Sequence, residues 1–251
     1  MNDPILEAKN VSSVLGSGAG RVQALKDVNL TLHGGELTML MGPSGSGKTT
    51  LLSILGFMLT PTSGSVCIRG QSTENGDAET LARVRREHIG LIFQSYHLFP
   101  TLTAAENVQV ALDVRGEAGS KARTRSHDAL AQVGLSHKIN SYPREMSGGE
   151  QQRVAIARAI VSTPSVILAD EPTAALDSGN GHAIMDVLAA IAKDPSRSVL
   201  VVTHDSRLTS FSSRIHSIED GRIVGEQPAA GSCPVHATPL PPNDAVRAET
   251  G

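Results

Sequence analysis

The sequence has no excess of basic residues and no long hydrophobic run. Lysine and arginine number 22 against 25 acidic residues, a net charge of -3, and the pI is about 6.3. Proteins that bind nucleic acid usually carry a basic surface, so nucleic acid is not an expected partner. The longest mostly apolar run, Leu51 to Leu59, has nine residues, whereas about 20 are needed to span a bilayer. We therefore expect any membrane association to occur through a partner.

Cysteine is scarce as well. Only Cys67 and Cys233 are present, far apart and in different contexts, so a disulfide framework is not expected and a reduced compartment fits. Cys67 stands between Val66 and Ile68 and is expected to pack in a core, whereas Cys233 lacks the second pair of ligands that a metal site needs. The first residues show no basic start followed by an apolar stretch, as a secretory signal would. A cytosolic location is the expectation.

Short apolar runs predict a mostly parallel sheet preceded by a small antiparallel sheet. Val28, Leu30 and Leu32 alternate with polar residues, as in a strand with one buried face. Four continuous apolar runs are instead typical of strands buried on both faces of a parallel sheet. These runs are Leu37–Met41, Ile89–Phe93, Val166–Ala169 and Val199–Val202. The sequence thus predicts an α/β fold with an N-terminal antiparallel β subdomain.

Residues 95–160 have helical patterns instead. Ala104–Val108 and Ala129–Val133 are apolar-periodic segments separated by glycine and proline breaks, which predicts an inserted α-helical subdomain. Further on, Asp220 and Gly221 separate two short apolar stretches, a pattern typical of a hairpin. We expect this hairpin to end the folded domain, residues 1–226. Five of the thirteen prolines then crowd into residues 227–251, and this Pro/Ala-rich tail is predicted to be disordered.

A phosphate-binding loop follows the first buried run. Residues 42–49 match the Walker A pattern at every required position, between a predicted strand and a predicted helix. Glycines let backbone N–H groups converge on phosphates, the helix N-terminus adds its dipole, and Lys48 supplies a positive charge. Thr49 would place its hydroxyl on Mg²⁺. The fold expected is a P-loop NTPase with a RecA-like core. The residues expected to bind the nucleotide here are Gly42, Pro43, Ser44, Gly45, Ser46, Gly47, Lys48, Thr49 and Thr50.

Two adjacent carboxylates follow the third buried run. Asp170 and Glu171 stand directly after Val166–Ala169, at the end of a strand where a phosphate-transferring site would lie. Asp170 suits the Mg²⁺ shell, and Glu171 suits orienting or deprotonating the attacking water. The alternative, two solvated carboxylates, is weakened because Pro172 and Thr173 fix the chain at this point.

Between the two motifs lies a segment that resembles the signature of one family. Ser147, Gly148 and Gly149 resemble the signature motif of ATP-binding-cassette (ABC) ATPases, with Met146 and Glu150 in place of that family's commonest Leu and Gln. Other elements of the family follow in the expected order. They are Gln94 after the strand at 89–93, Ala174-Ala175-Leu176-Asp177 after Glu171, and His204 after the strand at 199–203. The resemblance covers about residues 5–225.

This resemblance implies roles that spacing alone does not. Glu171 and His204 would be catalytic, with His204 contacting the γ-phosphate. Thr49 and Gln94 would bind Mg²⁺ directly and Asp170 would act through water, with Gln94 also sensing the transporter. Asp177 would lie at a dimer seam. Ser147, Gly148, Gly149 and Glu150 would cover the phosphates held by a second copy, in a sandwich dimer that takes ATP and Mg²⁺.

Residues 42–52, 92–108 and 169–178 are similar to the branch that drives macrolide and lipoprotein export, and especially to the ATPases of DevBCA-type glycolipid exporters. This similarity implies an ATP-hydrolysing subunit that powers export or extraction of a lipophilic or lipid-linked substrate. Its partners would be a separate permease with a periplasmic domain and, in some systems, a membrane-fusion protein, at the cytoplasmic face of the membrane. Residues 95–108 would dock the permease through Tyr96, Leu98 and Phe99, unless these side chains pack inside the helical insert.

Three alternatives to an exporter share the phosphate-loop motifs. A cassette ATPase of DNA repair or translation would show a coiled-coil insertion, zinc-binding cysteines or a second cassette, and none is visible in the sequence. An importer ATPase shares every catalytic motif, so only the similarity to the exporter branch argues against it. A cell-division-type ATPase, in which hydrolysis regulates a wall enzyme, is compatible with every motif found.

Aromatic residues make up only 2% of the chain, and one expected aromatic is missing. The family usually stacks adenine on an aromatic near residue 15, where this chain has Val14, Leu15 and Gly16. Leu15 or Val22 offers apolar contact without stacking, a loss of about 1 kcal/mol. We therefore predict weaker discrimination between nucleobases.

Overall fold

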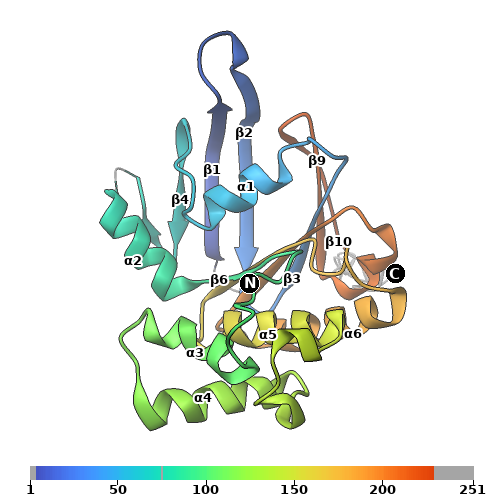
Figure 1. Ribbon diagram of the computed structural model, residues 1–251. Helices are drawn as coiled ribbons and strands as arrows, with labels where there is room; N and C mark the ends of the chain where they lie inside the picture. The colour runs from blue at the N-terminus through green and yellow to red at the C-terminus, as the bar shows by residue number, and fades with distance from the viewer. Residues whose placement is uncertain (1–3, 75, 229–251) are drawn as a thin grey trace, which may run out of the picture.

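The computed structural model describes residues 4–74 and 76–228. An antiparallel sheet at the top of Figure 1 has four strands in the order β2-β1-β4-β5. Its strands are β1 Pro4–Leu15, β2 Val22–His33, β4 Ser63–Ile68 and β5 Gln71–Ser72. Val28, Leu30 and Leu32 are buried, whereas Asn29 between them is exposed and Thr31 is partly exposed, which confirms the predicted amphipathic strand. This sheet is the N-terminal antiparallel subdomain.

A second sheet crosses the middle of the molecule. It has six strands in the order β10-β9-β3-β8-β7-β6, all parallel except β10, which pairs antiparallel with β9. The strands are β3 Leu37–Met41, β6 Ile89–Ile92, β7 Val166–Asp170, β8 Ser198–Thr203, β9 Arg214–Glu219 and β10 Arg222–Pro228. The four apolar runs and the hairpin are therefore confirmed as strands.

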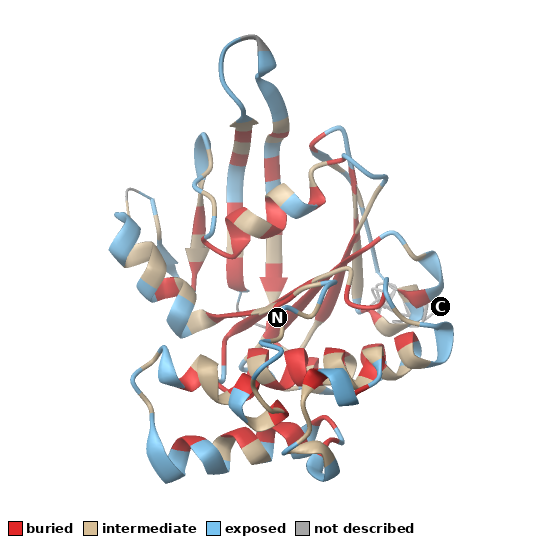
Figure 2. Cartoon of the chain, viewed as in Figure 1, coloured by how far each residue is buried: buried red, intermediate tan, exposed pale blue. Residues whose placement is uncertain are grey.

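The continuous apolar runs have a simple structural cause. Along β8, Val199 and Val201 pack into a cluster with the helical side of the molecule, whereas Leu200 and Val202 pack into a cluster with the antiparallel sheet. Because side chains alternate between faces, a strand covered on both sides needs apolar residues at every position. Figure 2 shows these central strands as mostly buried.

Six α-helices lie in the described part of the chain. They are α1 Lys48–Leu55, α2 Ala78–His88, α3 Ala104–Asp113, α4 Gly119–Gln132, α5 Gly148–Ile160 and α6 Ser178–Ala192. Shorter 3-10 turns cover Gly18–Gly20, Ser136–Lys138, Pro143–Glu145 and Ser206–Phe211. Helices α3, α4 and α5 form the helical layer below the six-stranded sheet in Figure 1, as the sequence predicts. None of the helices within residues 4–74 and 76–228 is both long and apolar enough to span a bilayer.

Two expectations differ from the structure in detail. Cys67 is partly exposed, while Val66 and Ile68 are buried, because neighbours on a strand point to opposite faces. Strand β10 runs to Pro228, so Gln227 and Pro228 of the expected tail belong to a strand. The rest of that tail lies outside the described residues.

Candidate nucleotide-binding site

The phosphate loop curls around the amino group of Lys48. Lys48 Nζ donates hydrogen bonds of 2.8 Å to the carbonyl oxygens of both Gly42 and Pro43. Gly47 has a φ of +100°, and a Cβ there would lie 2.6 Å from the carbonyl oxygen of Ala24, so only glycine fits. Among the described residues, no side chain caps the N-terminus of α1. Its first N–H groups can therefore serve an anion.

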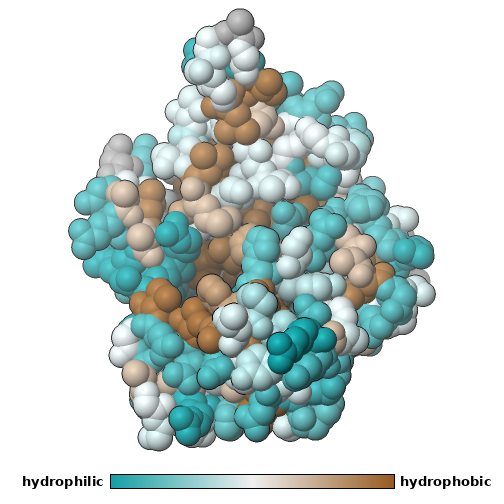
Figure 3. Space-filling view, in the orientation of Figure 1, coloured by the Kyte–Doolittle hydropathy of each residue, from teal (hydrophilic) through white to brown (hydrophobic). Residues whose placement is uncertain are grey.

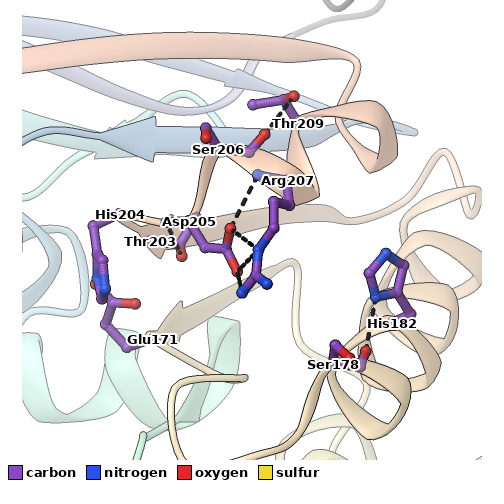
Figure 4. Close-up of polar contacts among 9 residues, drawn as sticks. All are labelled: Glu171, Ser178, His182, Thr203, His204, Asp205, Ser206, Arg207 and Thr209. Atoms are coloured by element: carbon purple, nitrogen blue, oxygen red, sulfur yellow. Dashed lines mark hydrogen bonds and ion pairs between the residues drawn. The ribbon is translucent and has the colours of Figure 1, made fainter.

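Glu171 and His204 meet where β7 and β8 end. Glu171 has a left-handed φ of 46°, and its N–H donates to the carbonyl oxygen of Val202 at 2.9 Å. This backbone turn directs the carboxylate to His204, whose Nδ1 lies 2.7 Å from Glu171 Oε1 (Figure 4). A protonated Nδ1 of His204 can donate a hydrogen bond to a carboxylate oxygen at this distance. The His204 side chain is 70% exposed, which leaves its ring open to a bound group.

The carboxylate of Asp170 lies in an electrostatically unfavourable position beside this pair. Burial raises the pKa of Asp170 and the charge of Glu171 raises it further, while Lys48 and Thr49 oppose the shift. A divalent cation would relieve this repulsion. Asp170 lines one cavity together with Thr49 and Gln94, and their carboxylate, hydroxyl and amide oxygens are the ligands that Mg²⁺ prefers. The residues present therefore fit Mg²⁺.

The cavity has a volume of about 920 Å³ and collects residues from seven segments of the chain. Gly42 and Ser46 support it from outside: a Cβ on Gly42 would lie 2.1 Å from the carbonyl oxygen of Ile218, and Ser46 accepts the N–H of Gly221 at 3.0 Å. The other expected nucleotide-site residues line it, namely Pro43, Ser44, Gly45, Gly47, Lys48, Thr49, Thr50, Gln94, Asp170, Glu171 and His204.

Sequence reasoning missed part of the cavity wall. Asp220 and Gly221, in the turn between β9 and β10, line the cavity beside Ala24 and Lys26. The Asp-Gly pair is visible in the sequence as a hairpin turn, but no pattern places that turn against the phosphate loop. The contact is close, because a Cβ on Gly221 would lie 2.6 Å from the carbonyl oxygen of Ala24.

The expected signature residues begin α5 and do not line this cavity. Ser147 accepts the N–H of Glu150 at 3.3 Å, and Glu150 Oε2 accepts the N–H of Ser147 at 2.8 Å. This capping box explains a glutamate where the family commonly has Gln, since either residue can accept from the Ser147 N–H. The hydrogen bond from Ser147 lowers the pKa of Glu150, and Lys138 Nζ lies 3.3 Å from its carboxylate.

Asp177 begins the neighbouring helix, α6. Its carboxylate accepts the N–H of Asn180 at 3.0 Å and the Asn180 amide at 2.6 Å, and the backbone hydrogen bond from Asn180 lowers the pKa of Asp177. A Cβ on Gly149 would lie 2.8 Å from Asn180 Oδ1. The signature segment and Asp177 therefore lie side by side, on a surface separate from the residues that line the cavity.

A mostly parallel sheet with a Walker A loop and two carboxylates at its strand ends defines a P-loop nucleotide hydrolase. Residues 25–174 match the family model described as ABC transporter. The macrolide export ATP-binding/permease protein MacB of Salmonella choleraesuis is 45% identical over 90% of this chain, which spans 35% of MacB. An uncharacterized ABC transporter ATP-binding protein of Methanocaldococcus jannaschii, MJ1508, is 44% identical over 88% of this chain and 98% of its own length.

Solved structures agree with these relatives. The ATP-binding cassette MJ0796, a dimer in a post-hydrolysis state bound to ADP and Pi, is 41% identical with a TM-score of 0.81, over 90% of this chain and 99% of its own. CbiO1 of Clostridium perfringens, part of the ABC transporter complex cbiONQ, is 27% identical with a TM-score of 0.80. The chain belongs to the ABC transporter family and is its ATP-binding, ATP-hydrolysing cassette.

Proposed function

We propose that this chain is the separate ATPase subunit of an exporter, and that it powers the export or extraction of a lipophilic or lipid-linked molecule through a permease on another chain. Similarity of 44–45% to the macrolide exporter MacB supports the exporter branch. This chain spans 98% of the ATP-binding protein MJ1508 and 35% of the ATP-binding/permease protein MacB. The chain would then act at the cytoplasmic face of the membrane, held there by the permease.

Within the cavity, we assign each step to residues of this chain. The loop N–H groups and Lys48 hold the triphosphate. Thr49 and Gln94 would hold Mg²⁺ directly and Asp170 through water, and the bound Mg²⁺ would neutralise charge on the phosphates. Glu171 orients and deprotonates the attacking water, and His204 fixes the Glu171 carboxylate while its other face contacts the terminal phosphate.

The signature residues would complete the site of a second copy. Ser147, Gly148 and Gly149 line no part of this chain's own cavity, yet the start of a 13-residue helix suits phosphate. The dimeric state of MJ0796 supports a sandwich of two copies. Asp177 beside the signature would then lie at the dimer seam.

A groove between α2 and α3 is the proposed docking site for the permease. It has a volume of about 510 Å³, and Phe99, Val110 and Val114 line it with Arg85 and Arg86. Phe99 is 49% exposed and Val114 64% exposed, and Figure 3 shows hydrophobic surface in this part of the molecule. Apolar walls with a cationic rim suit a short amphipathic helix that carries acidic side chains.

The three anchors expected from the sequence differ in their surroundings. Leu98 packs against the helical core, and Tyr96 lies against Gly148, where a Cβ would come within 2.9 Å of its hydroxyl. Only Phe99 projects into the groove. The geometry therefore favours Phe99 as the docking anchor, core packing for Leu98 and a contact with the start of α5 for Tyr96.

Phe99→Ala tests this proposal. We expect the variant to keep most of its basal ATPase activity and to lose about tenfold or more in affinity for the permease, because buried aromatic anchors dominate such interfaces. Basal and permease-stimulated hydrolysis should be measured against permease concentration, with Val224→Ala, an exposed apolar residue on β10, as the control. Equal losses of basal and stimulated activity would indicate core packing and reject the docking site.

A further inference from the structure

One short segment of the chain reaches both the nucleotide cavity and the docking groove. Gln94 lines the cavity, and Phe93, His97 and Phe99 line the groove. The segment runs between the end of β6 and the start of α3. Any displacement of Phe99 by a docked partner must therefore pass along a few residues to reach Gln94.

The backbone of this segment is held in an unusual conformation. Tyr96 and His97 are consecutive non-glycine residues with left-handed φ values of 59° and 48°. The His97 N–H donates to the carbonyl oxygen of Ser95 at 2.5 Å, and the His97 ring packs on Phe93 with centroids 4.8 Å apart. Residues with side chains adopt this region at a cost, so surrounding contacts must maintain it.

Arg158, on α5, supplies these contacts. Its guanidinium donates to the carbonyl oxygen of Tyr96 at 2.7 Å and to that of His97 at 2.5 Å. These are the carbonyls of the two left-handed residues. A planar guanidinium can donate two hydrogen bonds to neighbouring acceptors, which a lysine ammonium does less well. Burial lowers the pKa of Arg158, as expected for a cation satisfied by carbonyl oxygens rather than water.

A second contact ties the same segment to the start of α5. A Cβ on Gly148 would lie 2.9 Å from the Tyr96 hydroxyl and 3.8 Å from its ring. Tyr96 thus contacts the signature end of α5 with its side chain, while Arg158 holds its backbone from further along the same helix. The segment and α5 are joined at two separate points.

We propose that Arg158 is a positioning residue that fastens residues 94–99 to α5. When a docked partner displaces the residues that line the groove, Gln94 moves together with the signature residues at the start of α5. Gln94 belongs to one half-site and the signature residues belong to the other. Without Arg158 the left-handed turn relaxes, and docking no longer changes the position of Gln94. This inference rests on the proposed function only in naming the permease as the occupant of the groove.

Three variants test the positioning role. Arg158→Ala removes both hydrogen bonds, Arg158→Lys keeps the charge with poorer geometry, and Arg123→Ala removes an exposed arginine from α4 as the control. In the isolated protein, hydrogen exchange of the backbone amides at 95–99 should rise about tenfold or more in Arg158→Ala, because charge-assisted hydrogen bonds are lost. Arg158→Lys should fall between wild type and Arg158→Ala, and Arg123→Ala should match wild type.

Hydrolysis supplies the second measurement. Arg158→Ala should need several-fold more Mg²⁺ for half-maximal ATPase, since Gln94 is displaced, and its stimulation by saturating permease should fall to within about twofold of the basal rate. Arg158→Lys should recover part of both. Wild-type exchange at 95–99, or wild-type stimulation in Arg158→Ala, would overturn the inference. So would equal losses of basal and stimulated rates in both Arg158 variants.

The two proposals fail in different ways. If the permease neither binds nor stimulates the wild-type chain, the proposed function is wrong, while the exchange and Mg²⁺ measurements still decide the role of Arg158. If Arg158→Ala unfolds, Arg158→Lys carries the same measurements. In that case, normal Mg²⁺ dependence and normal exchange in Arg158→Lys would assign Arg158 to packing alone.

Discussion

Two helices of this chain begin where phosphate is expected, and their N-termini are built differently. Helix α1 follows Gly47, and within the described residues no side chain caps it. Helix α5 begins at Ser147, which forms a reciprocal capping box with Glu150. The first helix carries Lys48 at its start, whereas the second carries a carboxylate. One end is open and positively charged, and the other is closed and acidic.

Because of this difference, we expect α1 to bind phosphate within a single chain and α5 to bind it only in a dimer. The open N-terminus of α1 keeps its donors for a phosphate, and Lys48 adds charge, so it can bind nucleotide alone. At α5, two donors are already satisfied within the chain, and the N–H groups of Gly148 and Gly149 with the Ser147 hydroxyl remain. Such an end suits a second contact that forms only when another copy closes over the nucleotide.

Mixed dimers give the largest expected effect. Lys48→Ala disables the open end and Ser147→Arg blocks the closed end, and each alone should lose at least about a hundredfold in ATPase activity. If one copy's α5 covers the other's cavity, mixing the two variants equally should restore roughly a quarter of wild-type activity, because half the dimers contain one intact site.

The control for this experiment pairs two defects of the same cavity. Lys48→Ala mixed with Glu171→Gln should restore nothing, since each cavity in every dimer contains one defect. If the first mixture also stayed inactive while the chains still dimerised, the signature residues would not act on the partner's nucleotide.

Glu150→Gln sharpens the comparison with a smaller effect. Glutamine can keep the bond from the Ser147 N–H but removes a negative charge from the end of α5 that we propose meets the partner's phosphates. We expect ATP-dependent dimerisation, measured by ultracentrifugation in a Glu171→Gln background, to tighten about two- to fivefold, and more at low salt. Glu106→Gln alters the matching capping box of α3 at Thr103 and should leave dimerisation unchanged. Equal dimer affinities for Glu150→Gln and its parent would show that Lys138 already neutralises the carboxylate.

Much of this architecture could be predicted from sequence, because it depends on local patterns. The buried strands appear in the sequence as continuous apolar runs. The glycines of the Walker A loop are needed because the backbone of this loop lies close to the backbone of neighbouring segments. The capping box at Ser147 was not predicted, although it too has a local pattern, a serine three residues before a glutamate. Its presence explains Glu150 without any appeal to function.

Other features depend on contacts between distant residues. Arg158 binds carbonyl groups 61 and 62 positions earlier in the chain, and no periodicity records such a pair. The position of Gly221 against Ala24 depends on how the β9–β10 hairpin packs on β2. The expectation that Cys67 packs in a core was wrong. A short apolar run does not show whether its strand is covered on one face or on both.

The cavity at α1 also lacks the aromatic residue on which the family usually stacks adenine. Leu15 and Val22 pair across β1 and β2, line the cavity and are 38% and 63% exposed. Figure 3 shows hydrophobic surface close to the tip of the β1–β2 hairpin, and aliphatic side chains offer contact there but no stacking. We expect comparable hydrolysis of ATP and GTP, and Leu15→Tyr should improve ATP binding about fivefold, the equivalent of about 1 kcal/mol.

Leu15→Ile is the matched control, since it changes shape without adding a ring. Apparent affinities for ATP and GTP should be compared for the three proteins, and only the tyrosine variant should bind more tightly. A strong ATP preference in the wild type would mean that polar groups of the cavity read the base, and the aliphatic pair would then not set specificity.

The smallest effect is expected on stability, from the ion pair that Asp205 forms just after His204. Asp205 accepts hydrogen bonds from the Arg207 side chain and backbone (Figure 4), and the Arg207 side chain chiefly lowers the pKa of Asp205 to about 2. A carboxyl whose pKa is lower in the folded state stabilises the protein above its ordinary pKa, near 3.8, and loses that contribution as pH falls toward 2.

Asp205→Asn isolates the charge, because asparagine can still cap the following turn. Exposed ion pairs contribute little to stability, so the variant should melt only about 1–3 °C lower at pH 7. The difference should shrink below pH 3.8 and be lost as the pH falls through about 2. Thermal melts of both proteins between pH 2 and 7 measure this, with Arg207→Gln expected to follow the same curve. A difference in melting temperature that stays constant with pH would mean that Asp205 fixes the turn after His204 through its shape rather than its charge.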